Sequence, residues 1–282
     1  MRVLAALVLV TVTSLGCAAG PSAGARGAMA RAGPDDGGAT ASRAQPVARL
    51  EPAVVAMPRD AETSIADVAR YIAEREPDQR ARIKAMHDWV ADRLTYDPSE
   101  AQVLVVVSPR GEPDRALCDL LPVACPPRDA PGLAPLFVPP SELDAIAALG
   151  DGGELPRVRD YLAERAFVLR RGVCAHYAAL MNRLGAAVGE EIVYVRGEAR
   201  TRDGAFGDHA WNVARIGDHY EPLDVTWDSG YGDRHAFRRH YSNDWLFVSP
   251  DEFITTHFPA DARWQLQATP KSRSWFLKAE RR

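Results

Sequence analysis

The chain has 282 residues and a net charge of -4, from 34 basic and 38 acidic side chains, with 46% hydrophobic residues. This length supports a sizeable core in one large domain or two modest ones. The near balance of charge argues against nucleic acid as a partner. Four cysteines are too few for a disulfide-dense scaffold, and none of them forms the close C-x-x-C pairs that a structural zinc site needs.

Residues 1–16 have the features of an export signal. Arg2 provides a positive start, and the apolar run that follows is too short to span a bilayer permanently. The run ends in Ser14-Leu15-Gly16-Cys17, which resembles the bacterial lipoprotein cleavage box, with Ser14 where an aliphatic residue is usual. We expect lipidation of Cys17 and a place in the cell envelope as a membrane-anchored lipoprotein. Simple secretion after cleavage near Ala18 is the alternative.

Residues 17–60 are rich in Ala, Gly and Pro and carry few large apolar side chains. This composition predicts a disordered tether. A lipid on Cys17 would then hold the folded part of the chain near a membrane surface without embedding it. The remaining residues, 61–282, are predicted to form a single domain.

Two helices open this domain. Ser64 is a good N-cap, and the helix that it starts carries apolar residues at helical spacing until Pro77 ends it. A second helix is expected from Asp78, with Ile83 and Met86 on its apolar face. We interpret His87 on this second helix as a packed edge residue. Asp228, much later in the chain and close to Gly230, is interpreted as a polar loop residue.

Helical periodicity fails between residues 98 and 156, where Pro and Gly clusters surround one strand-like run, Val103–Val107. An excursion of this length is usually an ordered cap or a functional loop. We therefore treat 98–156 as an insertion and expect it to border the functional cleft of the domain. Cys118 and Cys125 both lie in it. In an exported chain they are candidates for a disulfide; two free buried thiols are the alternative.

The second half of the chain changes from helices to strands. A helix is expected from Pro156 to Arg170 and another from about Cys174, followed by strands at 192–195, 209–216 and 219–227. Helices first and an antiparallel sheet afterwards predict an α+β domain.

Cys174 is the cysteine left over if Cys17 is lipidated and Cys118 pairs with Cys125. It stands at the predicted start of a helix, where the helix dipole and unpaired backbone N–H groups favour a reactive thiolate. A buried cysteine that acts only as a small hydrophobe is the alternative. His176, two residues later, is expected to be structural or exposed.

A nucleophilic thiol needs a base and a group that orients the base. Gly217-Asp218 is a two-residue hairpin turn that pairs Ile216 with His219. Extending this register places His209 opposite Thr226 and Trp211 opposite Asp224, with all four side chains on one face. Asp224 is then a diagonal neighbour of His209, and a slip of one residue would move it to the other face.

These residues carry a family resemblance. Arg171-Gly172-Val173-Cys174, His209-Ala210-Trp211-Asn212 and Leu223-Asp224-Val225-Thr226-Trp227 resemble, in this order, the cysteine, histidine and aspartate motifs of the transglutaminase-like superfamily. Downstream, Phe247-Val248-Ser249-Pro250 and Thr256-His257-Phe258-Pro259 resemble the branch that contains kyphoscoliosis peptidase and cytokinesis-type relatives. The resemblance extends from about residue 81 to residue 267, with the excursion as an interruption.

The resemblance implies a papain-like fold in which Cys174 is the nucleophile, His209 the general base and acid, and Asp224 the residue that orients the imidazole. It implies a protein or peptide amide as substrate, an acyl-thioester intermediate, and no cofactor or metal. Trp211 and Asn212 are candidates to shield the site from water.

Three outcomes stay open at this point. Water as the acceptor gives a peptidase or amidase, and a lysine amine gives a transglutaminase. Animal transglutaminases carry a tryptophan upstream of the cysteine, whereas no tryptophan lies between Trp89 and Trp211 here, which favours hydrolysis. The third outcome is a protein-binding module that has kept the fold without catalysis.

Overall fold

The computed structural model describes residues 48–101, 106–107, 137–138, 156–200, 204–232 and 237–278. The predicted signal segment, Cys17, most of the predicted tether and most of the 98–156 insertion, with Cys118 and Cys125, lie outside these residues. Within them, no helix is both long and apolar enough to cross a membrane.

The first described elements are helical and begin where the capping residues predict. The Ser64 side chain accepts a hydrogen bond from the Asp67 N–H, and the Asp78 side chain accepts one from the Ala81 N–H, so each caps the helix that follows. This region contains α1 (Pro52–Val55), the 3-10 helix η1 (Arg59–Ala61), α2 (Ile65–Arg75) and α3 (Gln79–Arg93).

The folded part begins earlier than the sequence predicts. α1 lies within residues 17–60, the range predicted as a tether, and Val54 is fully buried in the main core. The backbone N–H of Glu51 donates to the Asp88 carboxylate over 2.7 Å. The tether prediction is therefore wrong for its last residues, because a few apolar side chains at its end pack against α2 and α3.

Short strands and two longer helices lead to the sheet. β1 and β4 pair in parallel, as do β2 and β3, and α6 and α7 pack on each other. These elements are β1 (Thr95–Tyr96), the 3-10 helix η2 (Pro98–Ala101), β2 (Val106–Val107), β3 (Phe137–Val138), α6 (Pro156–Leu169), β4 (Arg171–Gly172) and α7 (Cys174–Ala187).

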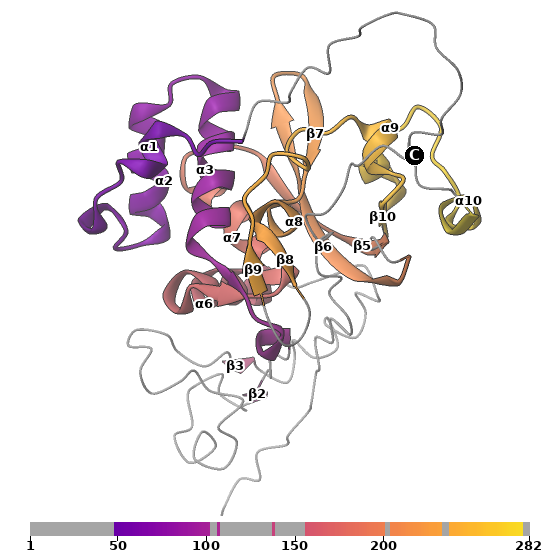
Figure 1. Cartoon of the computed structure of the whole chain (residues 1–282), viewed down its shortest axis with the longest axis horizontal. Helices are drawn as coiled ribbons and strands as arrows, with labels where there is room; N and C mark the ends of the chain where they lie inside the picture. Colours follow the sequence, from indigo (N-terminus) through magenta and orange to yellow (C-terminus); the bar gives the residue numbers. More distant parts are fainter. Residues whose placement is uncertain are drawn as a thin grey trace, which may run out of the picture.

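The main sheet is antiparallel, with strand order β10-β5-β6-β7. Helices α1 to α3 lie to one side of it in Figure 1, with α7 next to the strands and α9 and α10 beyond the opposite side. The sheet and the elements after it are β5 (Ile192–Arg200), β6 (Phe206–Ile216), β7 (His219–Leu223), α8 (Val225–Ser229), β8 (Gly230–Gly232), β9 (Phe237–Arg239), α9 (Pro250–Phe253), β10 (His257–Pro259), the 3-10 helix η5 (Ala262–Gln265) and α10 (Arg273–Lys278).

The predicted hairpin register is confirmed, but β7 is shorter than predicted. Ile216 pairs with His219, and the ladder continues to Asn212 opposite Leu223. There the strand stops, because Asp224 accepts hydrogen bonds from the backbone N–H groups of Thr226 and Trp227 and so caps α8. The predicted strand 219–227 is therefore a strand followed by a helix.

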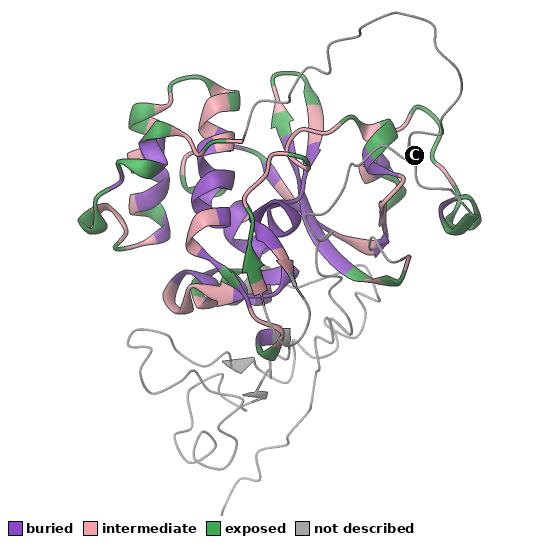
Figure 2. Ribbon diagram, viewed as in Figure 1, coloured by how far each residue is buried: buried purple, intermediate pink, exposed green. Residues whose placement is uncertain are grey.

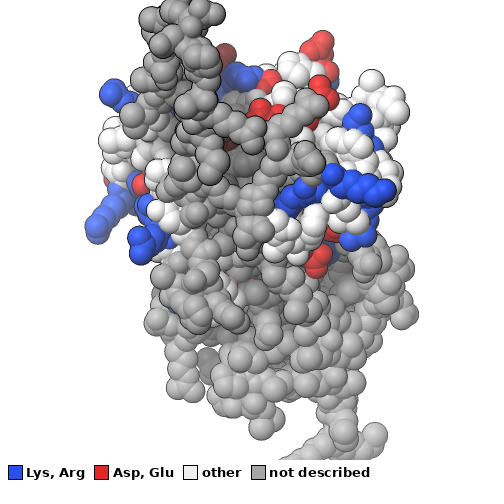
Figure 3. Space-filling view, turned by 45° about the vertical axis from the view of Figure 1, so that its right-hand side comes forward, with Lys and Arg blue, Asp and Glu red and all other residues white. Residues whose placement is uncertain are grey.

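The sheet separates two apolar clusters. The larger one fills the space between the helices and the sheet, and the smaller one, around Trp211, Val213 and Phe253, covers the other side of β6. Figure 2 shows the buried residues along α3, α7 and the middle of the sheet. Helices packed on an antiparallel sheet confirm the predicted α+β class. On the described surface in Figure 3, acidic and basic side chains both occur, in keeping with the small net charge.

Candidate active site

Cys174 is the first residue of α7, and 1% of it is exposed. The chain approaches it through Gly172, where any Cβ would collide with the Cβ of His176. His176 is buried and reaches back over this turn, with its Nδ1 atom 3.4 Å from the Val173 N–H. Cys174 therefore lies at a helix N-terminus, where unpaired N–H groups and the helix dipole favour negative charge.

The structure differs from the sequence-based expectation that Cys174 is a free thiol. Cys174 is part of a disulfide. Because Cys174 is the one cysteine among the described residues, its partner lies outside them. The sequence could not predict this pairing, because cysteine spacing does not fix disulfide connectivity. The predicted Cys118–Cys125 disulfide also falls outside the described residues.

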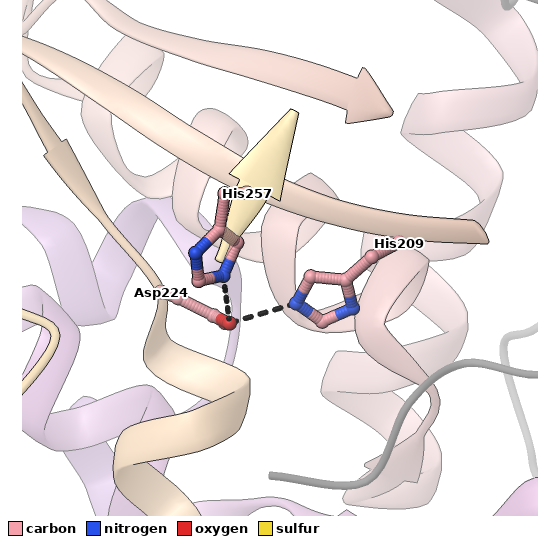
Figure 4. Close-up of side chains that lie close together, drawn as sticks. All are labelled: His209, Asp224 and His257. Atoms are coloured by element: carbon pink, nitrogen blue, oxygen red, sulfur yellow. Dashed lines mark hydrogen bonds and ion pairs between the residues drawn. The ribbon is translucent and has the colours of Figure 1, made fainter. Parts of the chain in front are cut away.

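His209 and Asp224 are brought together as predicted. The Nε2 atom of His209 lies 2.7 Å from Asp224 Oδ2, and both side chains are fully buried (Figure 4). The Nδ1 atom of His209 has no hydrogen-bond partner among the described residues. One ring nitrogen is thus held by a carboxylate, while the other is unpaired.

Asp224 uses its two oxygens differently. Oδ1 accepts from the Thr226 and Trp227 N–H groups at the start of α8, and Oδ2 faces His209. Burial alone would raise the pKa of Asp224. The positive charge of His209 and hydrogen bonds from His209 and His257 outweigh burial, and the net pKa shift is downward. Asp224 is therefore held as a carboxylate.

The two residues predicted to shield the site lie on opposite faces of β6. The Trp211 ring is stacked beside His209, with 6.0 Å between the ring centres. Asn212 is one residue further along the strand, and its side-chain amide donates instead to the carbonyl oxygen of Ala178 on α7. Asn212 therefore lies on the side of β6 away from His209 and joins the sheet to α7.

Tyr96 is held beside the segment that leads to Cys174. Through the β1–β4 ladder it pairs with Gly172, two residues before Cys174. Its pKa is raised, first by burial and then by the neighbouring Tyr177 and the Asp224 carboxylate. The charge of Asp224 therefore acts on a side chain that is fixed to the segment before Cys174.

Sequence reasoning gave His257 no role, and the structure places it in the site. Its Nε2 atom lies 3.2 Å from the same Asp224 oxygen that faces His209 (Figure 4). It arrives on β10, which pairs with β5 through Ala199 opposite His257. The motif around His257 marked this segment but not its contact with Asp224, because 33 residues separate the two in the chain.

His87 and Asp228 were interpreted as a packed edge residue and a polar loop residue, and the structure makes them a buried charged pair. His87 Nε2 lies 3.1 Å from Asp228 Oδ2, and its Nδ1 atom lies 3.2 Å from Asp88 Oδ1. Burial would lower the pKa of His87, but its hydrogen bonds to Asp228 and Asp88 raise the pKa to about 9. A protonated His87 therefore joins α3 to α8.

His209, Asp224 and His257 also have the composition of a metal site, and their ligand atoms lie within 4.8 Å of one another. Tetrahedral zinc, with bonds of about 2.0–2.2 Å, separates its ligand atoms by about 3.3 Å. The 2.7 Å between His209 and Asp224 is instead a hydrogen-bond distance. The geometry therefore fits three hydrogen-bonded side chains better than three ligands of a metal ion.

Comparisons with known proteins found two curated relatives and one solved structure that resemble part of this chain. No family model matches the chain. Kyphoscoliosis peptidase of Mus musculus is 32% identical over 109 residues, and that of Homo sapiens is 31% identical over 109 residues. Each match covers 35% of this chain and 16% of the relative, so the chain matches about one sixth of each relative's length.

A solved structure described as the crystal structure of a TGase aligns with a TM-score of 0.31 and 14% identity, covering 67% of this chain and 38% of that chain. A TM-score this low adds no argument to the sequence similarity. The similarity to the kyphoscoliosis peptidases confirms the predicted resemblance of this chain to the transglutaminase-like superfamily.

Proposed function

We propose that the chain is a thiol-dependent acyl-transfer enzyme that acts on amide bonds of proteins or peptides, with Cys174, His209 and Asp224 as its catalytic residues. The observation that carries the proposal is the buried hydrogen bond between His209 Nε2 and Asp224 Oδ2. This bond fixes the proton on Nε2, so Nδ1 is the nitrogen left to exchange a proton with a thiol.

The reaction begins with reduced Cys174. His209 Nδ1 takes the thiol proton, and the thiolate attacks the carbonyl carbon of the substrate amide. In this proposal the Cys174 backbone N–H, at the start of α7, donates to the oxyanion. His209 then returns the proton to the departing amine, which leaves an acyl thioester on Cys174. The buried Asp224 carboxylate stabilises the imidazolium that forms during these steps.

Hydrolysis of the thioester is the favoured outcome. Water attacks with His209 again as the base, which releases the acid and restores the thiol. Two observations support water over an amine as the acceptor: both curated relatives are named as peptidases, and no tryptophan stands between Trp89 and Trp211. The disulfide at Cys174 adds the requirement that the sulfur be reduced before the cycle starts.

A single incubation tests this proposal. The reduced chain is mixed with a glutamine-bearing protein and a labelled primary amine, and new amino termini and bound label are both measured. We expect new amino termini and no bound label. The new amino termini should be absent with Cys174→Ala. With Asp224→Asn, which keeps the size of the side chain but not its charge, they should form at least about a hundredfold more slowly.

The other outcomes are distinct. Bound label without cleavage would replace hydrolysis with amine transfer. Neither product, together with a Cys174 alkylation rate equal to that of a free model thiol, would overturn the enzyme proposal and leave the protein-binding module. The alkylation rate is read by mass spectrometry of the peptide that contains Cys174, because the chain has three other cysteines.

The proposal includes a location at the cell envelope through lipid on Cys17, which follows from the N-terminal sequence alone. Expression in a bacterial host with a labelled fatty acid tests it. Label should enter the chain and be lost with Cys17→Ser. An unlabelled chain found in the medium would favour secretion instead.

A further inference from the structure

His257 is a buried imidazole whose two nitrogens both have partners. Nε2 lies 3.2 Å from Asp224 Oδ2, and Nδ1 lies 2.9 Å from the hydroxyl oxygen of Thr256. In Figure 4, His257 and His209 approach the Asp224 carboxylate from different strands. Nothing in the proposed chemistry so far uses His257, so its position needs a separate explanation.

The hydrogen-bond partners fix the position of the proton on this ring. A neutral imidazole carries one N–H, and a carboxylate can only accept. Nε2 must therefore be the donor toward Asp224, and Nδ1 must be the acceptor. Thr256 can meet that requirement because its hydroxyl reaches Nδ1 over 2.9 Å, a shorter distance than the 3.2 Å to its alternative acceptor, the Phe253 carbonyl oxygen.

The surroundings keep His257 neutral. Its ring stacks on Phe253 at 3.9 Å between ring centres and lies 4.4 Å from Trp227 and 5.3 Å from Trp245. Burial lowers the pKa of His257 to about 4, against the opposing effect of its hydrogen bond to Asp224; the charge of His209 lowers it further. His257 therefore donates a hydrogen bond to Asp224 without bringing a second positive charge, which would compete with His209.

We infer that His257 is a positioning residue, which holds the Asp224 carboxylate in place for His209 and is itself fixed in the required tautomer by Thr256. This inference rests on the proposed function. Two donors from different directions locate Oδ2, while the cap of α8 locates Oδ1. Without His257, a buried anion would lose one donor and one of the contacts that aim it at His209.

Four variants of the reduced full chain test the inference. His257→Phe keeps a ring for stacking on Phe253 but removes the donor, and Thr256→Val keeps the shape but removes the hydroxyl. His257→Gln and Thr256→Ser are the matched controls, because each keeps a hydrogen-bonding group. The readouts are the pH profile of Cys174 alkylation, the thermal unfolding temperature, and the tautomer of His257 by nitrogen-15 NMR.

We expect His257→Phe and Thr256→Val to slow alkylation near pH 6 about tenfold, with a changed pH profile, while the two controls stay close to wild type. The NMR spectrum of the wild type should show the proton on Nε2, and Thr256→Val should weaken that preference. Thr256→Val also serves as the informative variant if His257→Phe does not fold.

The failures of the two proposals are distinguishable. If wild-type Cys174 reacts no faster than a model thiol, the proposed function fails and the positioning role fails with it. If wild-type Cys174 reacts fast and Thr256→Val and a folded His257→Phe react at the same rate with the same pH profile, only the positioning role is overturned. A wild-type spectrum with the proton on Nδ1 would overturn it as well, whatever the rates.

Discussion

His87 and Asp228 form a fully buried pair in which the imidazole Nε2 and the carboxylate Oδ2 are 3.1 Å apart. Asp228 lies one helical turn after Asp224, and its carboxylate also accepts hydrogen bonds from Ser242 and from the Trp245 backbone N–H. The pair therefore anchors α8, whose N-terminal cap is the Asp224 carboxylate, to α3. The His87–Asp228 pair takes no part in the proposed reaction, but it helps to fix the orientation of Asp224, a proposed catalytic residue.

Replacing His87 with Gln should destabilise the fold in a pH-dependent way. The pKa of His87 is raised to about 9 from an ordinary 6.5. Its stabilising contribution is thus fully present below pH 6.5 and is lost as the pH rises through 9. We expect the difference in unfolding free energy between wild type and His87→Gln to shrink by about 3 kcal/mol over that range. Urea denaturation at several pH values measures it, and a constant difference would contradict a protonated His87.

Local sequence signals predicted the elements that depend on neighbours in the chain. Ser64 and Asp78 begin α2 and α3 because their side chains satisfy backbone donors a few residues away. Gly217 adopts a φ of 60° in the hairpin turn, which set the register of β6 and β7 correctly. These features depend on contacts within a few residues, which sequence patterns record.

The contacts that the sequence did not reveal join distant parts of the chain. Asp224 was predicted to reach His209 along an extended strand, whereas it does so as a helix cap. His257 and the His87–Asp228 pair depend on tertiary pairing across 33 and 141 residues. Charged His and Asp side chains are seldom fully buried. The sequence therefore favoured a packed edge position for His87 and a polar loop for Asp228.

Asn212 should be important for stability, because it joins the sheet to α7. Its side-chain amide donates to Ala178 O over 2.9 Å and to Val193 O over 3.2 Å. We expect Asn212→Leu to lower the free energy of unfolding by about 2 kcal/mol, since these donors are lost in a fully buried place. Asn212→Asp should cost more, because a carboxylate would then face two carbonyl oxygens.

Asn182 provides a matched control for this prediction. It also joins α7 to the sheet, with its amide donating to Ile192 O, but it is only partly buried. Asn182→Leu should cost less than Asn212→Leu in the same denaturation experiment, because water can replace part of the lost bonding. Equal losses at the two positions would show that burial of Asn212 is not the deciding factor.

The N-terminal boundary of the folded part can be tested by truncation. Val54 is fully buried, and Glu51 is bonded to Asp88 through its backbone N–H. A chain that begins at residue 48 should unfold at the same temperature as one that retains the whole tether, and a chain that begins at 61 should unfold several degrees lower. Val54→Ala in the longer chain should lower the free energy of unfolding by about 2 kcal/mol. Equal unfolding temperatures for starts at 48 and 61 would restore the boundary expected from composition.

Activity should depend on reduction of Cys174. A disulfide sulfur cannot act as the nucleophile, so the oxidised chain should neither alkylate at Cys174 nor cleave an amide. Addition of a reductant should restore both, and the free thiol count should rise by two for each disulfide opened. Cys118→Ser and Cys125→Ser, made separately, provide the comparison, because a variant that removes the partner of Cys174 should need no reductant. An untreated wild-type chain that is fully active at Cys174 would contradict the disulfide, whereas a reduced chain that stays inert while His209 and Asp224 are intact would contradict the nucleophile.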